Sequence, residues 1–198
     1  MLIFNQTYAK DIEMRRIRML FTYNECVNKY GSKYLVSKAV KAGQLYKQES
    51  GVYSDKEYVP ALAVIARKYP DAIFTMNSAF YYYDLTDVIP EKFYLATDRD
   101  ATKIADKRVV QIFERRNLLD LGLTTMDREG CSIRIYSRER LLVELIRHKK
   151  KIPFDYYKEL MRNYRDIIYD LDIPAIEEYA YEVPKSSMIM ETLRLEVL

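Results

Sequence analysis

Apolar and polar positions separate cleanly at helical spacing between Lys33 and Ala42. On a wheel of about 100° per residue, one side is apolar and consists of Leu35, Val36, Ala39, Val40 and Ala42. The other side has no acid and consists of Lys33, Tyr34, Ser37, Lys38 and Lys41. A surface helix usually mixes both signs on its exposed side, because Glu–Lys pairs four residues apart stabilise it. The pattern therefore predicts a helix that buries one side and presents unbalanced positive charge on the other, although a small helical subdomain with a solvated lysine face has the same pattern.

Boundary residues place this helix second in a pair. Thr22 with Glu25 three positions later is a capping-box signature for a first helix. Gly31 ends that helix, Ser32 caps the next, and Gly43 closes it. The spacing predicts two short helices joined by a tight turn.

A short hairpin is predicted after the second helix. Residues 45–48 and 52–53 read as strands on either side of a turn that contains Gly51. Residues 11–21 have apolar positions at near-helical spacing and are predicted as a preceding helix, whose Arg15 is a candidate phosphate contact. This order is that of a winged helix-turn-helix, and we expect residues 1–54 to form a DNA-binding domain of this kind.

The DNA contacts expected in this domain lie on the second helix and on the wing. Lysine acts mainly as a point charge for phosphates, so sequence reading is expected to fall to Ser37, Tyr34 and Gln44. Lys47 and Gln48 on the wing are expected to reach the DNA backbone or the minor groove. The candidates are Lys33, Tyr34, Ser37, Lys38, Lys41, Gln44, Lys47 and Gln48.

The rest of the chain, residues 55–198, is predicted to form a mixed C-terminal domain. Strands are expected over 72–75, 92–97, 109–113, 119–125 and 132–136, with helices over 58–69, 77–85, 138–148, 154–171, 174–183 and 185–198. The pattern predicts an α+β fold, with a small, mainly antiparallel sheet followed by several helices.

The charge along the 198 residues is uneven. The net charge of +3 combines +5 over residues 1–53, +3 over 54–153 and −5 over 154–198. A basic front of this kind favours a polyanionic partner. No apolar run approaches the roughly 18 residues that span a bilayer, and no leader peptide is indicated, so we expect a cytoplasmic protein without a membrane partner.

Residue types also argue against most catalytic and metal sites. Cys26 and Cys131 match no metal or redox motif and are expected to be reduced, and His148 is the only histidine. The acids at 98, 100 and 106 lie in a polar connection, and there is no glycine-rich phosphate loop. We therefore expect neither a metal nor a cofactor, and not an enzyme; a metal-dependent nuclease is the weakest alternative.

Basic side chains of the C-terminal domain are a second set of candidate DNA contacts: Arg115, Arg116, Arg134, Arg147, Lys149, Lys150 and Lys151. Arg140, Glu144 and Arg147 share one side of a predicted helix, where an exposed strip of ion pairs is the favoured interpretation. The three lysines have no such local partners. We hypothesise that the basic face continues onto this domain, so that DNA following both would bend. The acidic tail, with Glu177, Glu178, Glu182, Glu191 and Glu196, is expected to engage another protein or to cover the core.

Three stretches, at residues 42–53, 69–90 and 135–146, resemble the AbiEi antitoxins of bacterial type IV, abortive-infection toxin–antitoxin systems. They read AGQLY…GVY, YPDAIF with NSAF and LTDVIP, and IYSRERLLVELI. The sequence departs from the pattern at Tyr83-Asp84, where relatives often have His-Gly. The resemblance covers most of the chain.

The resemblance implies a transcriptional regulator active in phage defence. Its N-terminal domain would bind inverted repeats in the promoter of its own two-gene operon, and its C-terminal domain would be needed for antitoxicity. The antagonist would be a nucleotidyltransferase-like toxin, countered without a stable complex. Oligomeric state is open between a monomer and a weak dimer that binds cooperatively. The alternative is a winged-helix repressor whose second domain senses a small ligand.

Overall fold

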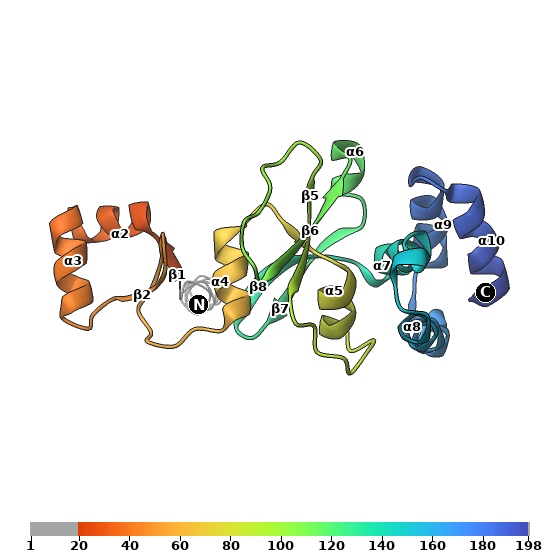
Figure 1. Ribbon diagram of the computed structural model, residues 1–198, viewed down its shortest axis with the longest axis horizontal. Coiled ribbons are helices and arrows are strands. Elements are labelled where there is room, and N and C mark those ends of the chain that lie inside the picture. Colours follow the sequence, from red (N-terminus) through yellow and green to blue (C-terminus); the bar gives the residue numbers. More distant parts are fainter. Residues whose placement is uncertain (1–19, 198) are drawn as a thin grey trace, which may run out of the picture. The chain divides into compact units, whose positions relative to one another are not determined.

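The computed structural model describes residues 20–197, which divide into two compact units. The first unit contains residues 20–70 and residues 127–133, and the second contains residues 71–126 and 134–197. The described residues form nine α-helices and two sheets (Figure 1), so the α+β prediction is confirmed. The predicted boundary after Ser54 stays a prediction, and the helix that follows it groups with the first unit.

The first unit begins with a three-stranded antiparallel sheet and a pair of helices. Its elements are β1 (Leu20–Thr22), α2 (Tyr23–Tyr30), α3 (Lys33–Lys41), β2 (Tyr46–Glu49), β3 (Val52–Ser54) and α4 (Ala61–Lys68). The sheet order is β1-β3-β2. The two helices and the hairpin therefore lie where the sequence pattern places them.

The predicted helix over residues 11–21 is wrong at its last two positions. Leu20 and Phe21 lie in β1, where they face Ser54 and Tyr53 of β3. Residues 11–19, including Arg15, lie outside the described residues. These residues form a strand because they pair with another strand more than thirty positions away, and local periodicity contains no information about that partner.

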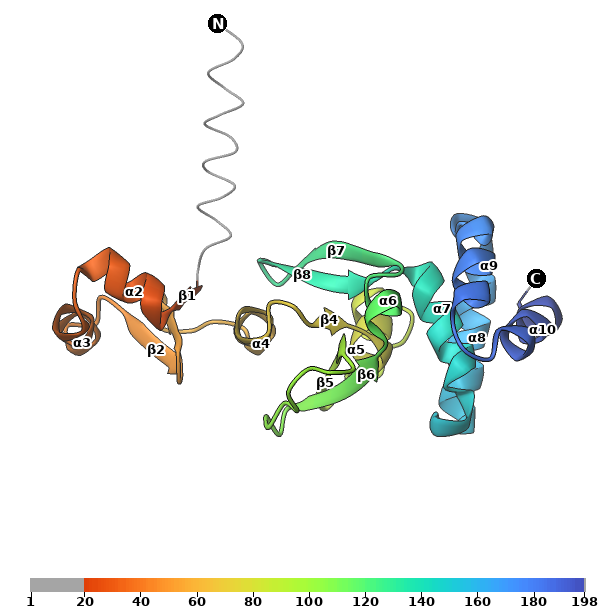
Figure 2. The ribbon, with the colours of Figure 1, turned by 90° about the horizontal axis from the view of Figure 1, so that it is seen from above.

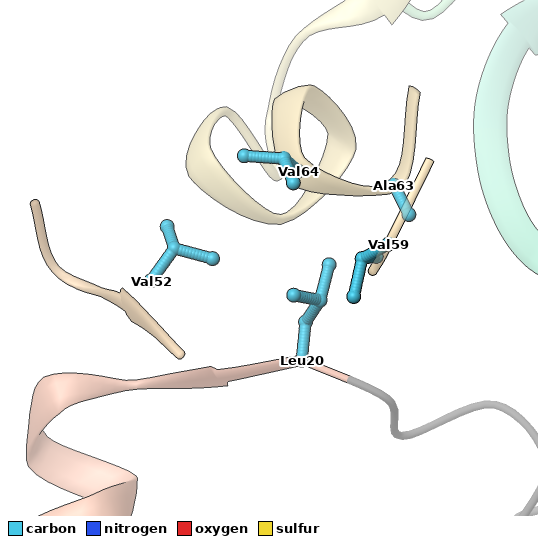
Figure 3. Packing of buried hydrophobic residues seen from close by; sticks show 5 residues of the cluster. All are labelled: Leu20, Val52, Val59, Ala63 and Val64. Atoms are coloured by element: carbon cyan, nitrogen blue, oxygen red, sulfur yellow. The ribbon is translucent and has the colours of Figure 1, made fainter. Parts of the chain in front are cut away.

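One apolar cluster joins the small sheet to α4. Figure 3 shows the side chains of Leu20, Val52, Val59, Ala63 and Val64 converging from β1, β3, the segment just before α4 and α4 itself. Cys131, at the tip of a hairpin, packs against the same cluster. Both cysteines are free thiols, as expected.

A second apolar cluster holds the two helices against the hairpin. It contains Cys26 of α2, Val36 and Ala39 of α3, Leu45 and Tyr53. Val36 and Ala39 are 2% and 4% exposed, as the helical wheel predicts. The wheel is wrong for two of its inward positions, because Leu35 is 42% exposed and Ala42 is also exposed. The helix is short and packs along a narrow stripe, which leaves the edges of its apolar side in solvent.

The second unit contains most of a five-stranded sheet of order β6-β5-β4-β8-β7, of which residues 127–133, at the joined ends of β7 and β8, group with the first unit. Its strands are β4 (Ile73–Phe74), β5 (Phe93–Asp98), β6 (Val109–Glu114), β7 (Leu123–Arg128) and β8 (Cys131–Tyr136). The predicted mainly antiparallel sheet is wrong: the pairs β5–β6 and β4–β8 are parallel, whereas β4–β5 is antiparallel. Strand direction is set by how each connection crosses the sheet, and the apolar pattern of a strand is the same in either direction.

The predicted strand over residues 119–125 is displaced. Residues 116–119 form the one-turn helix α6 (Arg116–Leu119), and β7 starts only at Leu123. Gly122, with φ +70°, makes the turn between them. The turn at Glu129-Gly130 joins β7 to β8, with both residues at positive φ.

The remaining helices are α5 (Met76–Tyr82), α7 (Arg138–Arg147), α8 (Phe154–Asp166), α9 (Ile173–Glu182) and α10 (Ser186–Glu196), with 3₁₀ turns at Lys149–Lys151 and Ile168–Asp170. Figures 1 and 2 show α7 to α10 gathered together within this unit. The helix predicted over 154–171 ends at Asp166. In α10 Ile189 and Leu193 are buried, whereas Leu195 is 79% exposed.

Candidate nucleic-acid interface

Helix α3 presents its lysines on a side that the core leaves open. The Ser32 hydroxyl caps the helix by accepting a hydrogen bond from the Leu35 backbone N–H at 3.2 Å. Burial of Val36 and Ala39 fixes the rotation of the helix about its axis. The outward side chains are therefore all exposed: Lys33, Tyr34 (75%), Ser37, Lys38 and Lys41.

None of the three lysines of α3 has an ion-pair partner among residues 20–197. The acids of the two helices and the hairpin are Glu25 and Glu49, and each is engaged by a cation of α4. Arg67 binds the Glu25 carboxylate, which also closes the capping box with Thr22, and Lys68 Nζ lies 3.2 Å from Glu49 Oε2. The hydrogen bond from Arg67 holds the pKa of Glu25 below its ordinary value, against the effect of burial. Helix α4 thus neutralises the local carboxylates and leaves the α3 charge uncompensated.

The hairpin contributes an exposed cation to the same surface, together with a side-chain amide that is already hydrogen-bonded within the protein. Lys47 of β2 is exposed, and so is Gln44 in the turn before the strand. The Gln48 amide donates hydrogen bonds to the backbone carbonyls of Lys56 and Glu57 at 2.9 and 3.2 Å. Gln48 therefore braces the segment after the hairpin, which leaves Lys47 as the side chain available to a backbone phosphate.

The basic candidates of the second unit differ from one another in their surroundings. Arg115 and Arg116 are exposed at α6, and Lys150 and Lys151 are exposed in the 3₁₀ turn after α7, with Lys149 half-buried. The guanidinium of Arg134 donates to the Asp71 carbonyl and lies 3.1 Å from an Asp120 carboxylate oxygen. The exposed members of this set are accessible to solvent, whereas Arg134 is held in place by protein acceptors.

Arg147 belongs to a buried ion cluster and not to an exposed strip. Its Nη1 lies 2.5 Å from Glu114 Oε2 and 2.9 Å from Glu144 Oε1. Arg140 is fully buried, with Nη2 2.8 Å from Glu144 Oε1 and 3.4 Å from Glu114 Oε2. The predicted pairing of Arg140, Glu144 and Arg147 is correct, but its predicted exposure is wrong, because Glu114 of β6 supplies a second buried carboxylate. That partner comes from a distant strand, and no local pattern in the sequence indicates it.

The ion cluster also shifts the pKa of Glu144. Burial alone would raise the pKa of Glu144, but the neighbouring His148, Arg140 and Arg147 outweigh it and lower the pKa to about 2. Glu144 is therefore held as a carboxylate, and His148 Nε2 lies 3.2 Å from its Oε2. The cluster fastens α7 to β6.

A groove in the second unit was not anticipated from the sequence. It has a volume of about 610 Å³ and lies between the 3₁₀ turn after α7, helix α8 and the end of α10. Lys149 and Lys150 line it, which brings two of the predicted basic residues to the edge of a largely apolar floor. The sequence signal for this groove is weak, because its apolar and basic residues alternate within ordinary helical periodicity.

Residues 20–197 contain no group of three or more His, Cys, Asp and Glu side chains placed to hold a metal ion. Of the loop acids, Asp106 is paired with Arg108 at 2.7 Å, and Asp98 accepts a hydrogen bond from the Asp100 N–H. No described helix combines the length and the apolar character that a bilayer crossing requires.

Neither the models of known protein families nor the curated protein sequences contain a match to this chain.

Proposed function

We propose that this protein is a DNA-binding transcriptional regulator in which α3 is the recognition helix and the β2–β3 hairpin is the wing. The observation that carries the proposal is the side of α3 with three exposed lysines, which have no carboxylate partner within residues 20–197. A helix with such a side suits the major groove, where phosphates flank the base edges on both sides.

Roles within the proposed interface follow from the chemistry of each side chain. Lys33, Lys38 and Lys41 would neutralise phosphates, because an ammonium group is a compact charge without directional preference. Tyr34 and Ser37 would contact base edges, since both present hydroxyl groups on the exposed side of the helix. Lys47 would reach the DNA backbone from the wing.

The proposal extends, on the resemblance to AbiEi proteins, to an antitoxin that represses its own toxin–antitoxin operon. In that role the second unit would counter a nucleotidyltransferase-like toxin without forming a stable complex with it. Co-expression of the chain with a nucleotidyltransferase-like protein encoded beside it tests this part: rescue of growth supports it, and unchanged toxicity refutes it.

The DNA-binding proposal is tested by fluorescence anisotropy on the promoter region upstream of the chain's own gene. Changing Lys33, Lys38 and Lys41 together to Ala removes three phosphate contacts. We expect affinity to fall between about tenfold and a hundredfold, and the slope of log K against log salt to become shallower by about 2 to 3.

A matched triple variant gives the control. Lys92, Lys103 and Lys107 are exposed lysines of the second unit outside the proposed interface. Their change to Ala alters the net charge of the protein equally. The slope of log K against log salt should therefore differ from that of the wild type by no more than about 0.9, the value of one phosphate contact. Equal losses in the two variants would mean that only net charge matters, and the α3 proposal would be abandoned.

A further inference from the structure

The groove beside α8 combines an apolar floor with a strongly cationic rim. Its floor is formed by Ile152, Phe154, Tyr157 and Met161. Its cationic side chains are Lys149, Lys150, Lys158, Arg162 and Arg165. The only carboxylate among the described lining residues is that of Glu196, and it already accepts a hydrogen bond from the Tyr157 hydroxyl at 2.9 Å. The groove therefore has many more positive than negative side chains, and they surround an apolar floor.

Phe154 stands out among the apolar residues of the floor. It is the first residue of α8 and is 68% exposed, with the Lys158 ammonium 4.6 Å from the centre of its ring. Covering an exposed ring with an apolar group is favourable, because it removes apolar surface from water. The ring and the ammonium group therefore offer a ligand an apolar contact and a positive charge side by side.

The start of α8 adds to the attraction for an anion. Pro153 precedes the helix, and no described side chain caps its first turn. The free N–H groups of a first turn carry a partial positive charge that favours a negative group nearby. Asp155, an acid in the same turn, offsets part of this field, so the cations of the rim supply most of the attraction for an anion.

We propose that this groove binds a small amphipathic anion, with a phosphate or carboxylate head at the lysines and a hydrocarbon body on Phe154, Met161 and Ile152. The volume is in the range of small-molecule sites, which span about 300–1,000 Å³. A nucleobase is a poorer occupant than a hydrocarbon, because its polar edge would lose water against a floor that offers few hydrogen-bond partners. Duplex DNA cannot enter an apolar groove of this size.

The experiment is isothermal titration calorimetry of the full chain with octyl phosphate below its critical micelle concentration. We expect one site per chain. Octanol and inorganic phosphate, each representing half of the ligand, should bind at least about tenfold more weakly, because each loses either the charge or the apolar contact. Adenosine monophosphate should also bind more weakly than octyl phosphate.

Two variants locate the site, and neither is among the proposed DNA contacts. Lys158→Glu reverses a charge at the rim and Phe154→Ala removes the exposed ring; each should weaken octyl phosphate binding by about fivefold or more. Lys103→Glu makes the same charge change at an exposed position away from the groove and should leave binding unchanged. Circular dichroism confirms that each variant is folded, which is expected because Phe154 and Lys158 are both exposed.

Several outcomes would overturn the proposal. The first is no binding of octyl phosphate. The second is binding that Lys158→Glu and Phe154→Ala leave intact, as Lys103→Glu does. The third is binding of adenosine monophosphate as tight as that of octyl phosphate. Sedimentation with anionic phosphatidylglycerol vesicles, without binding of the monomeric ligand, would assign the groove to a membrane surface instead. Because no DNA is present, failure here is distinct from failure of the DNA-binding proposal.

Discussion

At the scale of single residues, the least predictable feature is the buried cluster of Glu114, Arg140, Glu144 and Arg147. Arg140 has no exposed surface, and its Nε and Nη1 have no hydrogen-bond partner among the described residues. Its guanidinium carbon lies 5.1 Å from the centre of the Tyr136 ring, which offers a partial substitute through a cation–π contact. Charges buried at this depth are costly to separate, so the cluster acts as a rigid fastener between α7 and β6.

The low pKa of Glu144 predicts a dependence of stability on pH. A carboxyl whose pKa falls on folding, here from 4.5 to about 2, stabilises the folded state above the higher value. That contribution is lost as the pH falls through this window. Between pH 7 and pH 3 Glu144 alone should account for about 2 kcal/mol of the decrease in the free energy of unfolding.

The measurement is urea unfolding of wild type and Glu144→Gln at both pH values. Glutamine cannot titrate, so the variant should lose about 2 kcal/mol less than the wild type over this interval, although it is less stable at pH 7. Glu178→Gln, at an exposed position of α9, is the matched control and should reproduce the pH dependence of the wild type. An unchanged pH dependence in Glu144→Gln would show that this carboxylate is not stabilised by its neighbours.

At the scale of elements, the turn between α6 and β7 is fixed by a single glycine. A side chain at Gly122 would place its Cβ 2.5 Å from Arg140 Cβ and 3.2 Å from the Tyr179 ring. The backbone carbonyl of Gly122 also accepts a hydrogen bond of 2.7 Å from the Ser137 N–H, just before α7. The turn therefore positions the start of α7 and, through it, the arginines of the ion cluster.

Two glycine substitutions separate backbone strain from steric clash. Gly51 and Gly122 have similar φ angles of +81° and +70°, but nothing lies within 4 Å of a Cβ at Gly51. Gly51→Ala should cost about 1 kcal/mol of stability, from the left-handed backbone alone. Gly122→Ala should cost at least about 3 kcal/mol, because the clash adds to the same strain. Urea unfolding followed by circular dichroism measures both, and equal costs would mean that the packing around Gly122 yields easily.

At the scale of the whole molecule, the DNA-binding proposal predicts a definite number of cations in contact with phosphates. Six to eight neutralised phosphates predict a slope of log K against log salt of about −5 to −7, whereas contacts from α3 alone predict about −2 to −3. Arg147 does not belong in this count, because both of its carboxylate partners are buried with it. The exposed candidates outside α3 and the wing are Arg115, Arg116, Lys150 and Lys151.

The contribution of the second unit is measured by changing Lys150 and Lys151 to Ala in the same titrations. If both contact phosphates, the slope should become shallower by about 2, at about 0.9 for each contact. Arg99→Ala together with Lys103→Ala removes the same charge from an exposed loop and serves as the control. A steep slope that only the α3 variant reduces would confine DNA binding to the first unit.

The sequence by itself determined the elements whose signals are local. Thr22, Glu25, Gly31 and Ser32 mark the boundaries of α2 and α3 through hydrogen bonds that span three or four residues. The lysine side of α3 was likewise predictable, because helical spacing decides which side chains share a face. The α+β class followed from the same kind of information, summed over the chain.

The tertiary structure alone decided everything that depends on a distant partner. Leu20 and Phe21 became a strand because β3 pairs with them, and the sheet became mixed because of how its connections cross. Glu114 makes the expected surface strip a buried cluster, and cations of helix α4 pair with Glu25 and Glu49. These contacts join residues far apart in the chain, and periodicity along a sequence describes only which side of an element is apolar, not what covers it.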